Sequence, residues 1–277
     1  MRPRLAVAER RFRSEIHVKV ATWNINGVKA RLDGLLGYLK EAQPDVLCLQ
    51  EIKSTDDAFP RDEIEAAGYA LETHGQKGFN GVAVLSRIGF DEVVRGLPGD
   101  EGDEQARFME AVFSGGDRVL RVVSLYLPNG NPTHSDKFAY KLAWMDRLER
   151  WAVDRLSLEE PLVMLGDYNV IPEPHDCWDA ERWEGDALFR PESRDRFERL
   201  KHLGFTEAVR ACSDAPGVYT FWDYQAGARR KDHGIRIDHA LLSPEAAPFL
   251  VGCGIDAHVR DWEKPSDHVP VWVELDG

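Results

Sequence analysis

The residues best suited to chemistry lie at the ends of short apolar runs. Asp267 and His268 stand directly before the apolar residues 269–273, and Asp238 lies inside the apolar run 235–242. A charge at the entrance to a buried strand costs several kcal/mol unless a partner or a metal compensates it. An aspartate beside a histidine is also a common way to orient an imidazole. One Asp-His pair is weak evidence for a functional site, so its significance depends on whether other apolar runs also end in polar residues.

Four other apolar runs also end in polar residues, which offer carboxylates, amides and one phenol. These residues are Asn24, Asn26, Glu51, Tyr126, Asn129, Asp167 and Asn169. If the strand ends share one edge of stacked sheets, the side chains converge in a cleft. Carboxylate and amide oxygens with few thiolates favour a hard cation, Mg²⁺ or Mn²⁺, over structural zinc. Each residue taken singly is also ordinary turn or surface composition.

The elements that must position these residues are short, β-rich apolar runs. Their residues are 18–25, 45–49, 81–85, 119–127, 162–165, 235–242 and 269–275. Several runs are apolar on both faces, as expected for strands in sheets that are covered on both sides.

Helical periodicity appears between the predicted strands. Leucines over residues 32–39 predict an amphipathic helix that stops at Gln43-Pro44. Ser135 is suited to cap a long helix whose inner stripe extends to residue 152. A third stripe, at residues 197–203, ends at Gly204.

The remaining stretches predict loops rather than linkers. Residues 96–104 are acidic and glycine-rich, and residues 171–193 contain several prolines and tryptophans; both predict surface loops. Residues 18–277 hold no linker-like stretch, so we expect one mixed α/β domain with the sheets inside and the helices outside.

Composition leaves the partner open. The chain has 277 residues and a net charge of −13, and its first 19 residues carry six basic and two acidic residues. We therefore expect residues 1–17 to form a flexible basic extension. The acidic remainder argues against a polyanionic partner, unless the basic loops 74–78, 137–141 and 229–233 gather on one face. The four cysteines lack CxxC spacing, which suits a reducing compartment, and no apolar run is long enough to cross a bilayer.

The ordered set of motifs resembles the exonuclease III-type AP endonuclease family, within the DNase I-like metal-dependent phosphoesterases. The motifs are residues 23–27, 49–53, 126–129, 166–169, 220–224, 236–238 and 264–268. The resemblance runs from about residue 18 to the C-terminus, and the segments 74–78 and 222–224 are typical of the DNA-repair branch. It implies a four-layered α/β sandwich, two packed mixed sheets flanked by helices, with a cleft at one end.

The resemblance also implies roles at the matching positions. Glu51, with Asn26 and Asp267, would hold Mg²⁺, for which Mn²⁺ could substitute. Asp238 would orient His268.

Asp167, positioned by Asn24 and Asn169, is the preferred base for the attacking water. Tyr126 and Asn129 would contact the phosphate or the leaving oxygen. Which of Asp167 and His268 takes the proton, and whether one or two metals act, stays open.

Substrate contacts are predicted from two further sets of residues. Phe221, Trp222 and Ile235, with Ile237, would form an apolar pocket for a flipped sugar that lacks its base; the alternative is that the aromatics are core residues. Candidate phosphate contacts are Lys53, Lys77, Lys137 and Lys141, although single lysines are more often solvated surface residues.

The sequence thus predicts a Mg²⁺-dependent DNA repair nuclease. It would hydrolyse phosphodiesters 5′ to abasic sites in duplex DNA, with 3′→5′ exonuclease and 3′-end-trimming activity. Its partner would be double-stranded DNA with abasic sites or blocked 3′ ends, and it would act as a monomer, off the membrane, in a bacterial-type cytoplasm near the nucleoid. One alternative is a phosphoesterase of the superfamily acting on lipid headgroups, inositol phosphates or RNA. Another is a non-catalytic nucleic-acid-binding regulator, which should have lost several of these side chains.

Overall fold

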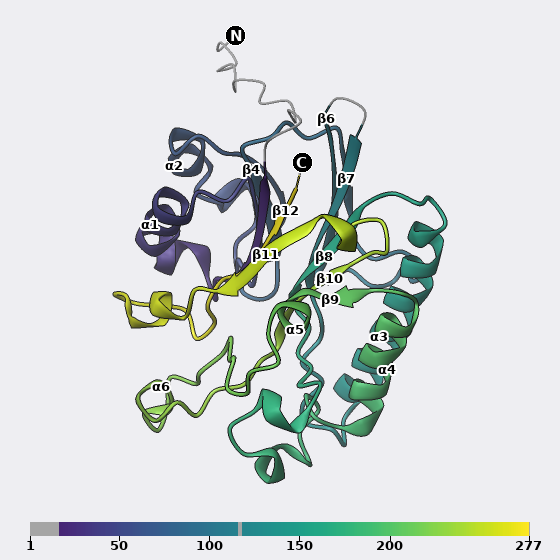
Figure 1. Ribbon diagram of the computed structural model, residues 1–277. Coiled ribbons are helices and arrows are strands. Elements are labelled where there is room, and N and C mark those ends of the chain that lie inside the picture. Colours follow the sequence, from purple (N-terminus) through teal and green to yellow (C-terminus); the bar gives the residue numbers. More distant parts are fainter. Residues whose placement is uncertain (1–16, 116–117, 277) are drawn as a thin grey trace.

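Two six-stranded sheets pack against each other, with helices on their outer faces (Figure 1). The computed structural model describes residues 17–115 and 118–276. The predicted basic extension, residues 1–17, therefore lies outside the described residues except for His17.

The first sheet has the strand order β11-β12-β1-β2-β4-β3. Its strands are β1 (Val18–Asn24), β2 (Val46–Gln50), β3 (Ala70–His74), β4 (Val82–Ser86), β11 (Leu250–Ile255) and β12 (Val271–Leu275). The second sheet has the order β5-β6-β7-β8-β10-β9. Its strands are β5 (Glu92–Arg95), β6 (Phe108–Gly115), β7 (Arg118–Tyr126), β8 (Leu162–Asp167), β9 (Thr206–Glu207) and β10 (Asp238–Leu242).

Helices cover the outer face of each sheet. Helices α1 (Leu32–Ala42) and α2 (Arg61–Ala66) pack on the first sheet, and the long helix α3 (Asp136–Leu156) with α4 (Pro191–His202) packs on the second. The short helices are α5 (Ala208–Cys212) and α6 (Ala228–Lys231), and the 3₁₀ turns are Val28–Arg31, Asp56–Ala58, Pro174–Asp176, Ala180–Trp183, Ala247–Phe249 and Ala257–Asp261. Among the described residues, none of these helices has the length and apolar character needed to cross a membrane.

Three apolar layers hold the sandwich together. Val20 and Val84 of the first sheet meet Val122 and Leu165 of the second in the central layer. The two outer layers lie between each sheet and its helices. Strands buried on both faces explain why their sequences read as continuous apolar runs. The predicted four-layered α/β sandwich is confirmed.

Strand direction brings the functional ends together. Strand β1 is parallel to β2, and β7 is parallel to β8, so their carboxyl ends lie at the same edge of each sheet. Strand β10 runs antiparallel to β8 and begins at that edge, with Asp238 opposite Asp167. Strand β12 is likewise antiparallel to β1, which places the residues before it at the same edge.

The predicted strands and helices are confirmed to within a few residues, except that the run 235–242 becomes a strand only at Asp238. Ser135 caps α3 as predicted, because its side chain accepts from the Lys137 N–H. The predicted loop 171–193 is wrong at its end, since α4 already begins at Pro191.

Strands β3, β5, β6, β9 and β11 were not predicted. In β6 the apolar run is interrupted by Glu110, which is 1% exposed and ion-paired to Arg121 and Arg155. The local sequence did not predict β6, because the ion pairs that allow Glu110 to be buried come from residues outside the strand.

Candidate active site

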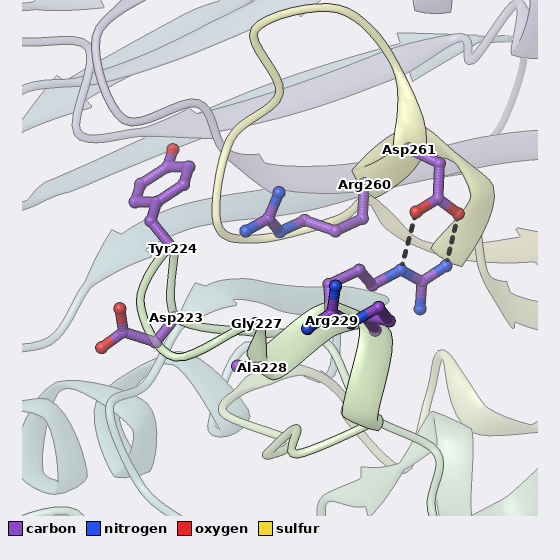
Figure 2. A pocket seen from close by; sticks show the side chains of 8 residues that line it. Asp223, Tyr224, Gly227, Ala228, Arg229, Arg260 and Asp261 are labelled. Carbon is purple, nitrogen blue, oxygen red and sulfur yellow. Dashed lines mark hydrogen bonds and ion pairs between the residues drawn. The ribbon is translucent and has the colours of Figure 1, made fainter.

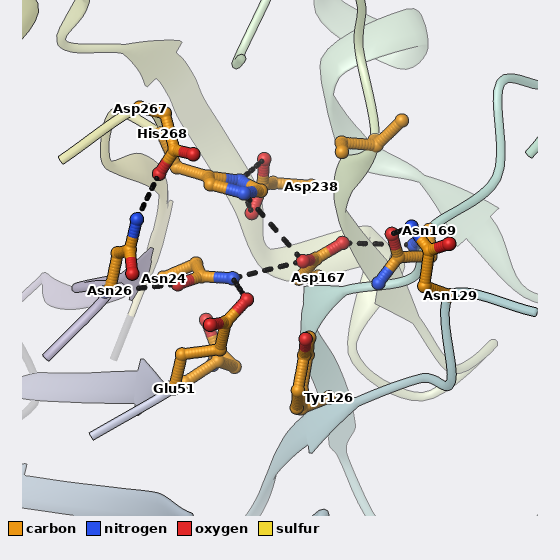
Figure 3. A network of polar contacts seen from close by, with 12 residues as sticks. Asn24, Asn26, Glu51, Tyr126, Asn129, Asp167, Asn169, Asp238, Asp267 and His268 are labelled. Carbon is orange, nitrogen blue, oxygen red and sulfur yellow. Dashed lines mark hydrogen bonds and ion pairs between the residues drawn. The ribbon is translucent and has the colours of Figure 1, made fainter. Parts of the chain in front are cut away.

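The polar residues at the strand ends form one connected network (Figure 3). Asn24 at the end of β1 donates through Nδ2 to Glu51 Oε1 at 3.1 Å and to Asp167 Oδ2 at 3.0 Å. One amide thus links a carboxylate of the first sheet to a carboxylate of the second. The predicted convergence of Glu51, Asp167 and His268 at one place is what the structure shows.

Asp167 is held by two asparagines at the end of β8. Besides Asn24 Nδ2, its carboxylate accepts from the Asn169 backbone N–H, with 2.9 Å between N and Oδ1. Burial raises the pKa of Asp167 to about 7; His268 acts against this rise, while Asp238 and Glu51 add to it. A carboxylate with a pKa near the working pH is well suited to accept a proton.

His268 is bonded to Asp238 and faces Asp167. Its Nδ1 lies 2.9 Å from Asp238 Oδ2, and its Nε2 lies 3.7 Å from Asp167 Oδ2. Burial alone would lower the pKa of His268, but the carboxylates of Asp238 and Asp167 outweigh it and raise the pKa to about 10. The raised pKa favours the imidazolium form near neutral pH, and this form can donate to an anion.

Glu51, Asn26 and Lys53 show where a cation fits. The Lys53 ammonium lies 2.8 Å from Glu51 Oε2 and 2.6 Å from Asn26 Oδ1. These two oxygens therefore face a common point that attracts positive charge, and as hard oxygen donors they suit Mg²⁺. Burial would raise the pKa of Glu51, but hydrogen bonding and charge from Lys53 lower it, so the carboxylate is ionised.

Asp267 borders this cation-binding position. Its Oδ1 accepts from Asn26 Nδ2 at 2.9 Å. Ligand atoms of Asp167, Asp238 and His268 also lie within 4.8 Å of one another. Since His268 Nδ1 is already bonded to Asp238 and Asp167 is held by its own donors, these three residues form an acid–base group rather than an ion cage.

Tyr126 and Asn129 lie on the side of the network formed by β7. Burial raises the pKa of Tyr126 well above its ordinary value, with Glu51 and Asp167 adding to the rise, so the phenol keeps its proton. Asn129 Nδ2 donates to Asn169 Oδ1 at 3.0 Å. Both residues can donate hydrogen bonds to an anionic ligand at the site.

The predicted apolar pocket is largely filled by its own side chains. Trp222 is 2% exposed, packs with Ala228 and Val269, and donates Nε1 to Asp232. The assignment of Trp222 as a substrate contact is corrected, because its ring is a core side chain. Ile235 is 1% exposed and packs in a separate apolar cluster. Phe221 is partly exposed and meets the His268 ring edge-on, with the centroids 4.9 Å apart.

The candidate lysines have different positions. Lys53 belongs to the network, whereas Lys77 and Lys137 lie on the surface outside it. The predicted basic loop 137–141 is wrong, because these residues lie in the first turns of α3. The prediction that Lys141 contacts phosphate is wrong, because Lys141 is 0% exposed and its ammonium bonds main-chain carbonyls.

The predicted basic loop 229–233 borders a pocket next to the site, but its residues 229–231 belong to helix α6. Figure 2 shows this pocket, of about 660 Å³, with Arg229 paired to Asp261 and Arg260 directed toward the Tyr224 ring. Tyr224 connects the pocket to the network, since Asn26 Nδ2 approaches its hydroxyl at 3.4 Å.

Sequence reasoning missed several supporting residues. Thr220 Oγ1 accepts from the Asp238 N–H at 3.1 Å, and Ser266 Oγ donates to the Asn24 carbonyl at 2.7 Å. Arg107 stacks on the Tyr126 ring at 4.7 Å. Thr220 and Ser266 lie inside the motifs 220–224 and 264–268, so the sequence could have identified them. No motif contains Arg107.

A sequence model of the endonuclease/exonuclease/phosphatase family matches residues 21–268. The chain belongs to this family. It is 35% identical over 266 residues to exodeoxyribonuclease III from Haemophilus influenzae. The alignment covers 93% of this chain and 100% of that protein.

Solved structures agree with this relationship. An AP endonuclease from Archaeoglobus fulgidus matches with a TM-score of 0.89 and 34% identity, covering 94% of this chain and 100% of that one. The 3′ phosphatase NExo from Neisseria, solved with a product DNA hairpin, matches with a TM-score of 0.90 and 36% identity over the same shares.

The resemblance to exonuclease III-type AP endonucleases is thus confirmed. The chain is a hydrolytic enzyme of the DNA repair nuclease type, in a family of metal-dependent nucleases.

Proposed function

We propose that the chain is a Mg²⁺-dependent nuclease that cleaves duplex DNA 5′ to abasic sites and trims blocked 3′ ends. The observation that carries the proposal is the pair of Asp167 and His268. A base with a pKa near 7 faces an imidazolium across 3.7 Å, next to oxygens arranged for a cation.

The chemistry needs several contributions at once. Phosphodiester hydrolysis requires the barrier to fall by roughly 20 kcal/mol. One positioned acid or base supplies about 3–5 kcal/mol. A base, a phosphate-binding cation, charge donors and an aligned substrate therefore have to act together.

The residues divide this work as follows. Asp167, oriented by Asn24 and Asn169, takes a proton from the attacking water as the new O–P bond forms and the bond from phosphorus to the 3′ oxygen breaks. His268 and Tyr126 donate to the phosphoryl oxygens, and Asn129 adds a further contact. Mg²⁺ held by Glu51, with Asn26 and Asp267 beside it, would neutralise the phosphate and stabilise the leaving 3′ oxygen.

Substrate selection is assigned to Phe221 and the apolar cluster behind it. A sugar without a base would lie against Phe221, beside the His268 ring. Because Ile235 and Ile237 already fill the space behind it, a normal nucleotide with its base would not fit.

The DNA-binding surface is assigned to Lys53, Lys77, Lys137 and the basic segment 229–233. These residues would neutralise backbone phosphates, so that an acidic protein still binds a polyanion locally. The enzyme would act as a monomer, on DNA in the cytoplasm.

The test uses duplex DNA that contains one abasic-site analogue, with Mg²⁺ or with EDTA. The proposal expects nicking 5′ to the lesion only with the metal, and slower trimming of a 3′-phosphate end. Binding without cleavage in both conditions would favour a non-catalytic regulator, and cleavage of inositol phosphates or lipid headgroups instead of DNA would favour another phosphoesterase activity.

A further inference from the structure

We propose that Lys141 is a positioning residue for hydrolysis, which holds Asn129 and Asn169 in place from the helical layer. The inference rests on the function proposed above. Lys141 Nζ donates to the Asn169 carbonyl at 2.5 Å and to the Asn129 carbonyl at 3.1 Å. These carbonyls belong to two different turns, one after β7 and one after β8.

Both turns have backbone conformations that need support. Asn169 has a φ of +48°, in the left-handed region, and Gly130 next to Asn129 has a φ of +89°. A non-glycine residue in this region is strained and persists when its surroundings hold it. Lys141 provides such a hold, because it bonds the carbonyl of the strained residue itself.

Asn169, which Lys141 holds, is in turn hydrogen-bonded to Asp167, the proposed base. The Asn169 N–H bonds Asp167 Oδ1, its Nδ2 bonds the Leu127 carbonyl at 2.9 Å, and its Oδ1 accepts from Asn129. If the Asn169 turn moves, Asp167 loses one of its two orienting donors. Lys141 thus acts on the carboxylate through one residue.

The Lys141 side chain is fully buried, and Gly130 leaves the room that it needs. It is 0% exposed, and a Cβ at Gly130 would come within 2.6 Å of Lys141 Cδ, so only glycine leaves room for its path. Burial lowers the pKa of Lys141 to about 7, against the charges of Asp167 and Asp186. An uncharged amine still has two N–H donors, so the two carbonyl contacts do not depend on its protonation.

The experiment compares Lys141→Met with Leu148→Ala, a buried substitution on the same helix in the apolar cluster behind the site. With abasic duplex DNA, Lys141→Met should lower kcat by about 10- to 100-fold with little change in KM. Leu148→Ala should destabilise the protein and leave kcat close to the wild-type value. Equal kcat for wild type and Lys141→Met, when the wild type is active, would overturn the inference and leave the proposed function intact.

A double-mutant cycle separates positioning from general damage. In an Asn169→Ala background, Lys141→Met should cost less than about threefold, because the path from Lys141 to Asp167 is already cut. Full additivity of the two substitutions would overturn the inference. If Lys141→Met fails to fold, Gly130→Ala displaces the lysine while keeping its amine and should lower kcat in the same way. An unchanged kcat in that variant would also overturn the inference.

A readout independent of turnover is the NMR signal of the asparagine side-chain amides. The Asn129 and Asn169 Nδ2 resonances should shift or broaden in Lys141→Met and stay in place in Leu148→Ala. Unmoved resonances would overturn the inference, even if the wild type showed no cleavage and the proposed function had failed.

Discussion

Asp167 Oδ2 and His268 Nε2 lie 3.7 Å apart, a separation at which opposite charges attract without a hydrogen bond. Each group is instead held by partners of its own, Asp167 by two asparagines and His268 by Asp238. The proposed mechanism therefore gives the two groups different roles: the Asp167 carboxylate takes a proton, and the His268 imidazolium keeps its own.

Asp238→Asn should keep the fold and reduce turnover by about 10²- to 10⁴-fold. The carboxylate that holds His268 as an imidazolium is lost, and the pKa of His268 falls. Steady-state nicking of abasic duplex DNA measures the loss, and NMR titration of the ring measures the pKa. Asp214→Asn, in an exposed loop, is the control; near-normal turnover of Asp238→Asn would refute the role of Asp238.

The pH dependence of cleavage should show an acid limb set by Asp167. Burial raises its pKa to about 7 in the metal-free protein, and only the ionised carboxylate can accept a proton, so activity should fall as the pH drops through the pKa of Asp167. Mg²⁺ beside Glu51 favours the ionised form and should move the limb to lower pH. Carbon-detected titration of the Asp167 carboxyl, with and without Mg²⁺, checks both the position and the shift. A pKa near its ordinary value of about 4 in the metal-free protein would contradict the expectation.

Glu51→Gln should raise the Mg²⁺ concentration needed for half-maximal activity by roughly tenfold or more. The substitution removes the charge that pairs with Lys53 and that would hold the ion. Direct Mn²⁺ titration by electron paramagnetic resonance measures binding apart from turnover. The matched control is Glu65→Gln on the exposed face of α2; equal Mn²⁺ affinity in both variants would remove Glu51 from the site.

Asp176→Asn should lower the free energy of unfolding by about 2–3 kcal/mol near pH 7. Burial acts to raise the pKa of Asp176, but hydrogen bonds and charge from Arg236 and Arg210 lower it from 3.8 to about 2. A lowered folded-state pKa stabilises the protein above about pH 4, and this contribution is lost as the pH falls through about 2. Urea unfolding at several pH values should therefore show the two proteins converging in acid. A difference that does not depend on pH would rule out the ion pairs as its cause.

Sequence alone determined the layers and most of the site. Apolar runs over residues 18–25 and 162–165 required strands that are buried on both faces, and the leucine stripe at 32–39 required a covering helix. The polar residues at the ends of these runs could be identified as candidate site residues because a charge beside a buried strand is costly unless a partner or a metal compensates it. Local sequence predicts these strands and helices because the burial of an element sets the pattern of apolar and polar residues along neighbouring positions of the chain.

Only the tertiary structure decided how the polar groups pair. Lys141 follows the pattern of a surface lysine, yet it is buried because two distant turns direct their carbonyls at it. Trp222 fits the pattern of a ligand contact and is instead packed inside. The state of His268 depends on Asp238 and Asp167, which lie 30 and 101 positions away in the chain. Burial and charge act through space, so these properties arise only when the two sheets close on each other.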